Sequence, residues 1–179
     1  MEQQKNLNKL AKMAMLVAIS IILVAIVHFP IFPAVAFLEY DPADVPIMIG
    51  TFAFGPLAGL LITVVVCLVQ GLTVSAGSGP YGIIMHLIAT GTFVLVAGNI
   101  YRHKKTKKEA IIALAAGTAA WVVVMYFANL TITPLFMGVP TEVVKGLMPF
   151  ILLFNAIKAG VNSIITFLLY KRISGFLHR

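Results

Sequence analysis

The sequence predicts an all-α integral membrane protein, a compact bundle of six transmembrane helices with both termini on the cytoplasmic side. Two observations lead to this prediction. Hydrophobic residues make up 60% of the 179 residues and charged residues only 11%, whereas a soluble domain is about half apolar and about a quarter charged. The apolar residues also fall into runs that suit a bilayer span of ~20 residues. Little chain remains for an extramembrane domain, so we expect any function to lie within or between the helices.

The apolar runs predict a single transmembrane domain over residues 1–179. We expect its helices at about residues 10–28, 46–54, 57–72, 82–101, 110–137 and 147–170. Gly55 and Pro56 divide the second helix from the third, because both residue types disfavour a helix interior. The charged turn Arg102–Lys108 divides the fourth helix from the fifth.

The distribution of basic residues predicts the orientation. With six spans, one side of the membrane holds eleven of the thirteen Lys and Arg residues: Lys5, Lys9, Lys12, Arg102, Lys104, Lys105, Lys107, Lys108, Lys171, Arg172 and Arg179. The other side holds Glu39, Asp41, Asp44 and Glu142, with Lys145 as its only basic residue. Cytoplasmic loops carry the excess of Lys and Arg, so both termini are expected in the cytoplasm. The net charge of +7 thus reflects orientation in the bilayer, and we expect no nucleic-acid partner.

A cleaved signal peptide is an alternative interpretation of the first apolar run. The run has a basic start, and residues 34–36 (Ala-Val-Ala) form a possible cleavage site. The apolar stretch is long for a signal, and Pro33 lies awkwardly beside the site. Cleavage would leave the orientation of the remaining helices unchanged.

Motifs of catalysis and metal binding are missing from the sequence. It contains no G-x-x-x-x-G-K-[ST] and no H-E-x-x-H pattern. The six carboxylates are expected in loops or tails, and the histidines are scattered, so we expect neither an enzyme nor a metal site, and no cofactor. Cys67, the only cysteine, is expected to be a small buried hydrophobe.

Polar residues inside the predicted spans indicate where a ligand could bind. Asn155, Lys158, Asn162 and Thr166 recur at spacings of three, four and four, which places them on one face of the last helix. A charge inside the bilayer is costly and normally faces the protein interior. The stripe is therefore either a ligand site or a buried network that joins helices, with Asn129 as a candidate member. His86 is also ionisable and has no partner in its own helix, so its role stays open.

The predicted loop before residue 46 has an unusual composition. Residues 37–41 combine Phe37, Leu38 and Tyr40 with Glu39 and Asp41. Large apolar groups in a loop indicate that the loop covers something, or that it belongs to an interfacial aromatic belt.

In the first helix, Ala14 and Ala18 lie four residues apart and, extended by Ala11, form a smooth face to which another helix could pack closely.

These segments together resemble the substrate-binding S components of energy-coupling factor (ECF) vitamin transporters. Residues 37–46 (Phe-Leu-Glu-Tyr-Asp-Pro-Ala-Asp-Val-Pro) look like the first external loop of the riboflavin-specific members. The Asn155-Ala-Ile-Lys158 segment also resembles theirs, and the Ala14/Ala18 pair resembles the motif that docks onto the transmembrane coupling subunit.

The resemblance implies that the chain binds riboflavin in a pocket near the extracellular side and delivers it through a coupling subunit and two ATP-binding subunits. The residues it implies for ligand binding are Phe37, Leu38, Glu39, Tyr40, Asn129, Asn155, Lys158 and Asn162. It also implies reorientation of the chain in the membrane to release the vitamin.

Other functions remain open at this point. The side chains of the stripe suit any planar heterocycle with alternating donors and acceptors, because an Asn amide offers both. An S component for thiamin or a pterin is therefore an alternative, and the narrowing to riboflavin comes from the resemblance. A stand-alone secondary transporter is another, although such proteins often contain internal repeats and we find none here.

Overall fold

Almost all of the chain is helical in the computed structural model, which describes residues 2–177. The elements in order are α1 (Glu2–Ile26), β1 (Phe29–Pro30), η1 (Pro33–Val35), β2 (Glu39–Tyr40), α2 (Asp44–Phe54), α3 (Pro56–Leu72), η2 (Ala76–Ser78), α4 (Gly79–His103), α5 (Lys107–Thr131), α6 (Thr133–Met137) and α7 (Thr141–Leu177). The two strands are two residues long and pair antiparallel. The predicted all-α class is thus confirmed.

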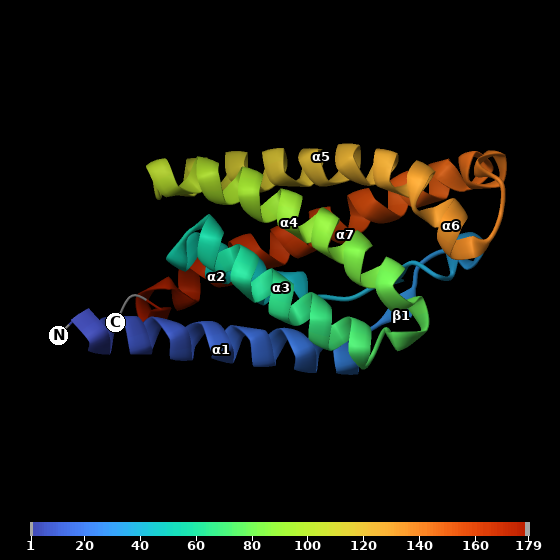
Figure 1. Cartoon of the computed structure of the whole chain (residues 1–179). Helices are drawn as coiled ribbons and strands as arrows, with labels where there is room; N and C mark the ends of the chain where they lie inside the picture. Colours follow the sequence, from blue (N-terminus) through green and yellow to red (C-terminus); the bar gives the residue numbers. More distant parts are fainter. Residues whose placement is uncertain (1, 178–179) are drawn as a thin grey trace.

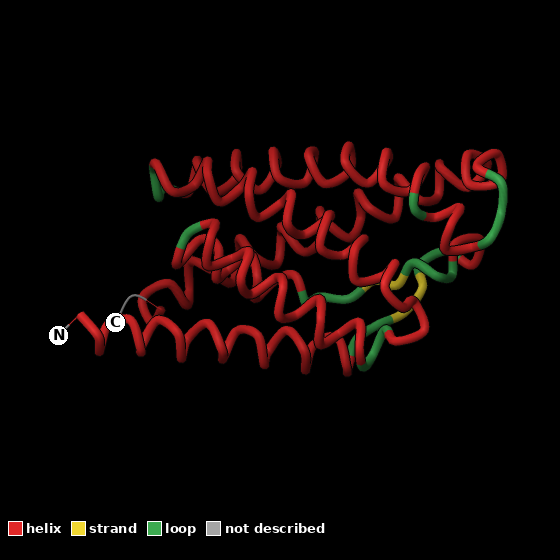
Figure 2. Tube along the Cα trace, in the orientation of Figure 1, coloured by secondary structure: helices red, strands yellow, loops and turns green. Residues whose placement is uncertain are grey.

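The long helices lie side by side as a bundle, with α1 and α5 on opposite sides and α2, α3, α4 and α7 between them (Figure 1). Within the described residues, four segments are long and apolar enough to cross a membrane: Gln3–Ile26, Ala76–His103, Lys107–Thr131 and Thr141–Arg172. Helices α2 and α3 are apolar but shorter. The start of α1, the α4–α5 turn and the end of α7 lie at one end of the bundle, and most of the loop chain lies at the other (Figure 2).

The junction between α2 and α3 lies where the sequence indicates it. Gly55 has φ of 92° and ψ of 170°, a conformation that side chains with a Cβ rarely adopt. Pro56 follows as the first residue of α3, where its missing N–H has no helical partner to lose. The pair therefore ends one helix and starts the next within a single residue.

Two expected helix boundaries are wrong. The helix expected over residues 110–137 is divided, because Pro134 has no N–H with which to continue the α5 ladder and instead opens α6. The loop expected at 138–146 is mostly the first part of α7. There Glu142 lies in the first turn, where the helix dipole favours an acid, and its Oε1 is 2.7 Å from Lys145 Nζ. Charges that suggested a loop thus form a pair on a helix.

A cluster of aromatic rings in the core joins α2, α4 and α7. The rings of Phe52 and Tyr101 stack with centroids 4.2 Å apart, and Tyr170 meets both edge-on. Helix α4 approaches the α2–α3 junction closely at Gly98. A Cβ added there would lie only 2.8 Å from Thr51 Cγ2 and 3.2 Å from the Pro56 Cα. Close packing at this end holds α2 and α3 against α4, and so fixes the walls of the cavity described below.

Replacing Gly98 with Ala should lower the free energy of unfolding by ~1–3 kcal/mol, the usual cost of overpacking, since the Pro56 backbone cannot move aside. Gly160→Ala in α7 is the matched control, because nothing lies within 4 Å of its Cβ and Ala favours a helix. Thermal unfolding of both variants in detergent measures the difference. Equal melting temperatures would contradict the close approach of α4 to the α2–α3 junction.

Candidate ligand-binding site

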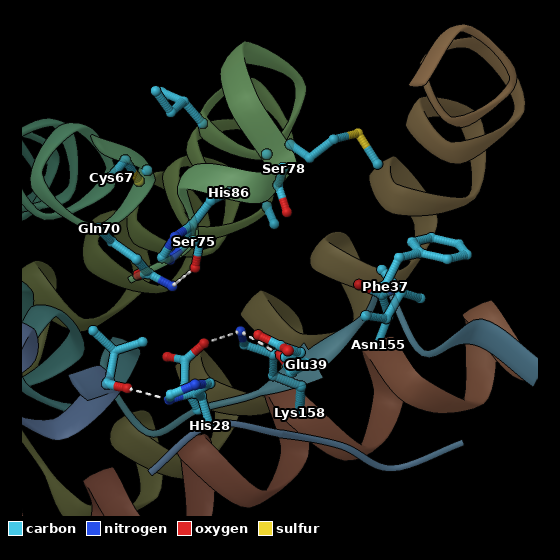
Figure 3. Close-up of a pocket in the computed structure, with 18 of the residues that line it drawn as sticks. His28, Phe37, Glu39, Cys67, Gln70, Ser75, Ser78, His86, Asn155 and Lys158 are labelled. Carbon is cyan, nitrogen blue, oxygen red and sulfur yellow. Dashed lines mark hydrogen bonds and ion pairs between the residues drawn. The ribbon is translucent and has the colours of Figure 1, made fainter. Parts of the chain in front are cut away.

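A cavity of about 140 Å³ lies between the loop that precedes α2 and helices α3, α4, α5 and α7 (Figure 3). The loop contributes Phe37, Leu38 and Glu39 to its wall. Phe37 and Leu38 are half-buried, whereas Glu39 is exposed. The large apolar groups of this loop therefore cover an internal space, as the sequence indicates.

Helix α7 supplies the polar side chains on one wall of the cavity. Asn155 and Lys158 line it, and both are buried. One and two turns further along the same face, Asn162 and Thr166 are fully buried and do not reach the cavity. The predicted stripe is thus one buried face of α7, of which only the first half borders the cavity.

Lys158 forms a buried ion pair with Asp41. Its Nζ lies 2.7 Å from Asp41 Oδ2, and the two side chains are 10% and 3% exposed. The same ammonium donates to the carbonyl oxygen of Glu39 at 3.4 Å. The sequence indicates no carboxylate partner for this lysine, because all six acids fall in segments expected to be loops or tails. The loop instead turns inward, and Asp41 enters the interior with it.

Asp44 is the second carboxylate that the sequence analysis placed wrongly. It is the first residue of α2, is fully buried, and accepts hydrogen bonds from side chains of two other helices, α4 and α7. Its Oδ1 lies 3.1 Å from His86 Nε2 and 2.7 Å from Thr90 Oγ1, and its Oδ2 lies 3.3 Å from Asn162 Nδ2. His86 therefore has its partner in α2, which no pattern within its own helix could indicate.

The remaining contacts fasten the loop to α7. Asn162 Nδ2 also donates to the Asp41 carbonyl oxygen at 3.1 Å, and its Oδ1 accepts from the Tyr40 hydroxyl at 3.0 Å. Burial, and next the Asp41 carboxylate, raise the pKa of Tyr40 above 10.0, so the phenol stays protonated and donates. Tyr40 and Asn162, which the sequence predicts as ligand contacts, thus join the loop to α7 and do not line the cavity.

Trp121 is a cavity residue that the sequence analysis missed. It lies in α5, is 2% exposed, and donates from Nε1 to Asn155 Oδ1 at 2.8 Å. Asn155 Nδ2 donates in turn to the Ile151 carbonyl oxygen at 2.9 Å. The indole fixes the orientation of the Asn155 amide and gives the cavity a flat apolar wall. The sequence gives one indication of its importance: Trp121 is the only tryptophan and lies inside a predicted span.

Asn129 borders a second, smaller space. A cavity of about 80 Å³ lies beside the first and shares Phe37 and Leu38 with it. Asn129 lines this second cavity, donates to the Met125 carbonyl oxygen and accepts from Thr133 Oγ1 at 2.8 Å. The structure therefore separates Asn129 from the α7 stripe with which the sequence analysis grouped it.

Ala14 and Ala18 lie on the exposed side of α1, away from the bundle interior, and Ala11 continues the same exposed face. The chain itself leaves this face uncovered, which suits contact with lipid or with another protein.

The lining of the cavity has the composition of a small-molecule site. The cavity combines aromatic and aliphatic walls with a few converging polar side chains, the usual make-up of small-molecule pockets. Within residues 2–177 no group of three or more His, Cys, Asp or Glu side chains is placed to hold a metal ion. Fold and site together define a multi-pass membrane protein whose helices surround an internal cavity.

The chain belongs to the family described as "ECF transporter, substrate-specific component", whose sequence model matches residues 8–170. It is similar to the riboflavin transporter RibU of Staphylococcus aureus (strain TCH60), with 33% identity over 190 residues that cover 100% of this chain and 96% of the relative. It is also similar to the riboflavin transporter FmnP of Bacillus subtilis (strain 168), with 27% identity over 188 residues that cover 97% and 96%. The resemblance inferred from the sequence is thus confirmed.

Solved structures agree with this assignment. A structure reported under "Structure and mechanism of the S component of a bacterial ECF transporter" matches with a TM-score of 0.82 at 34% identity, and covers 99% of both chains. ThiT from Listeria monocytogenes matches with a TM-score of 0.67 at 18% identity, and covers 97% of this chain and 98% of ThiT. At that identity the second match shows a common fold alone.

Replacing Lys158 with Met should lower the free energy of unfolding by ~3–5 kcal/mol, because it leaves the buried Asp41 carboxylate without its counter-charge. Adding Asp41→Asn to that variant should restore part of the loss. Lys145→Met is the matched control, since it removes a pair with the same 2.7 Å separation on the same helix, but in an exposed position, and should hardly change stability. Unfolding is measured in detergent without ligand. Equal effects of the two lysine substitutions would contradict a structural role for the buried pair.

Proposed function

We propose that the chain is the riboflavin-binding S component of an ECF-type importer, which captures the vitamin outside the cell with high affinity and passes it to a shared ATP-driven module. The observation that carries this proposal is the cavity, where Asn155 and Lys158 meet the flat indole of Trp121 beneath Phe37 and Leu38. The names of two relatives that match nearly the whole chain, both riboflavin transporters, support the choice of ligand.

The polar side chains keep free hydrogen-bonding capacity for a ligand. Lys158 has three N–H donors, of which one meets Asp41 and a second meets the Glu39 carbonyl at 3.4 Å. Asn155 uses one lone pair for Trp121 and one N–H for Ile151, so one of each remains. The pyrimidine edge of a flavin alternates carbonyl acceptors with an N–H donor. Asn155 and Lys158 can therefore recognise it in a planar ring held against Trp121.

The loop before α2 forms part of the cavity wall in this structure. The contacts of Lys158 with Asp41 and of Asn162 with Tyr40 hold it against α7. Phe37 and Leu38 then cover the apolar face of the bound ring, and Asn129 borders its far end through the second cavity. Glu39 contributes its backbone carbonyl, while its side chain stays exposed at the mouth.

The proposed orientation puts the pocket near the extracellular side. The start of α1, the α4–α5 turn and the end of α7 share one end of the bundle (Figure 1). These segments contain ten of the eleven basic residues, and Arg179 lies outside the described residues. The positive-inside rule places that end in the cytoplasm. We propose a single transmembrane domain of six spans, in which α2 and α3 are the two short ones and α6 does not cross.

The proposed partners are a transmembrane coupling subunit and two ATP-binding subunits. The chain has no phosphate-binding loop motif of its own, so energy for transport comes from the partners and the chain is not an enzyme. The exposed Ala11, Ala14 and Ala18 face of α1 is the proposed docking surface, because small residues let helix backbones approach closely.

Riboflavin should quench the fluorescence of Trp121 saturably in the purified protein, because the only tryptophan borders the proposed site. Thiamin should not. Calorimetry should then show Asn155→Ala weakening riboflavin by roughly five- to 150-fold, the equivalent of ~1–3 kcal/mol for unpaired ring groups. Asn99→Ala is the matched control, since Asn99 makes the same i−4 backbone hydrogen bond but does not line the cavity. A protein that binds thiamin or a pterin in preference to riboflavin would overturn the proposed ligand.

Replacing Ala14 or Ala18 with Leu should abolish vitamin uptake in cells that contain the energising subunits, while riboflavin affinity stays unchanged. The matched control is Ala115→Leu or Ala119→Leu, a pair with the same spacing that is also exposed but lies on α5, on the opposite side of the bundle. Uptake and binding are measured separately. Loss of uptake with both pairs, or normal uptake with all four variants, would contradict docking through α1.

A further inference from the structure

Gln70 has an unpartnered polar atom at the wall of the cavity that faces away from α7. The residue lies near the end of α3, lines the cavity and is only 7% exposed. Its Nε2 lies 3.3 Å from Ser75 Oγ, whereas its Oε1 is buried and makes no hydrogen bond within the described part of the chain. Burying a polar atom without a partner costs free energy, and native structures contain few such atoms. A ligand that completes this hydrogen bond therefore gains affinity here.

The surroundings of Gln70 form a second polar wall. Ser75, Ser78 and His86 line the same part of the cavity, and Figure 3 shows them across the cavity from Glu39 and Lys158. His86 uses Nε2 for Asp44, and its ring also interacts with the Cys67 side chain. This wall carries hydroxyl, amide and imidazole groups and no Lys or Arg, because the one ammonium that lines the cavity belongs to α7.

We propose that Gln70, Ser75 and Ser78 form a subsite for the polyhydroxyl chain of the ligand, with Gln70 Oε1 accepting a hydrogen bond from one of its hydroxyl groups. This inference rests on the proposed function, in which riboflavin supplies a planar ring and a neutral polyol tail. The ring occupies the side near Trp121 and Lys158, and the tail reaches across to α3 and η2.

The chemistry of the wall selects a neutral tail. A hydroxyl group both donates and accepts, so successive hydroxyls satisfy the Gln70 oxygen and the two serines together. A phosphate dianion accepts only, and would meet the lone pairs of Gln70 Oε1 with no Lys or Arg on that wall to balance its charge. The subsite therefore favours riboflavin over its 5′-phosphate.

The test compares riboflavin with lumiflavin, which keeps the ring system and has a methyl group in place of the polyol tail. Calorimetric titration of the full chain in detergent should show tighter binding of riboflavin than of lumiflavin or of the 5′-phosphate. Gln70→Met, which keeps the length and removes both polar atoms, should weaken riboflavin about five- to 150-fold and leave lumiflavin within about twofold. Thr73→Val is the matched control, because Thr73 bonds the Val69 carbonyl and does not line the cavity.

The outcomes separate the inference from the proposed function. If the unaltered chain binds no flavin, the proposed function fails. If it binds lumiflavin as tightly as riboflavin, no tail subsite exists, whether or not the Gln70 variant folds. If Gln70→Met weakens both flavins equally, Gln70 contacts the ring or supports the fold, and the subsite is overturned. Selective loss of riboflavin affinity, with lumiflavin binding as proof of folding, supports it.

Discussion

Lys158 and Asp41 place two opposite charges inside a bundle of apolar helices, and each is costly there without the other. Their 2.7 Å contact ties an irregular loop to α7. Because Asp41 is drawn inward, α2 begins within the bundle at the fully buried Asp44, which in turn gathers hydrogen bonds from α4 and α7. The shape of the cavity depends on this pair, since the loop and the helix that it joins form adjoining parts of the cavity wall.

Hydropathy and glycine–proline punctuation predict most of the helices, because those signals are local. They place the α2–α3 junction at Gly55 and Pro56 and the polar face of α7 at Asn155 and Lys158. They fail where a tertiary contact decides the outcome. The sequence predicts Asp41 to be a solvated acid in a loop. Only the fold shows that it forms an ion pair with Lys158, more than a hundred residues away.

The same limit explains which site residues escaped prediction. Periodicity within one helix can show that a face is polar, but it cannot show which face of another helix lies opposite. Trp121 and Gln70 each stand alone in their own helices, so they carry no pattern. The sequence singles out His86, but not its partner Asp44 in α2. Asn129 was grouped with the α7 stripe for its chemistry alone, and the structure places it at a neighbouring cavity. A polar residue inside a predicted span that has no partner in its own helix is therefore expected to have a hydrogen-bond or ion-pair partner on another helix.

Side chains of α7 take the place of solvent for a stretch of non-helical backbone. Within the bundle, Asn162 and Lys158 satisfy the carbonyl oxygens of Asp41 and Glu39, since irregular chain survives inside a membrane protein only where protein or water completes its hydrogen bonds. Lifting this loop into water exchanges those bonds for ones of comparable strength, whereas moving it into lipid would strand several polar groups at several kcal/mol each. Water at the mouth of the cavity can therefore replace these hydrogen bonds at little cost, whereas the hydrocarbon of the bilayer cannot.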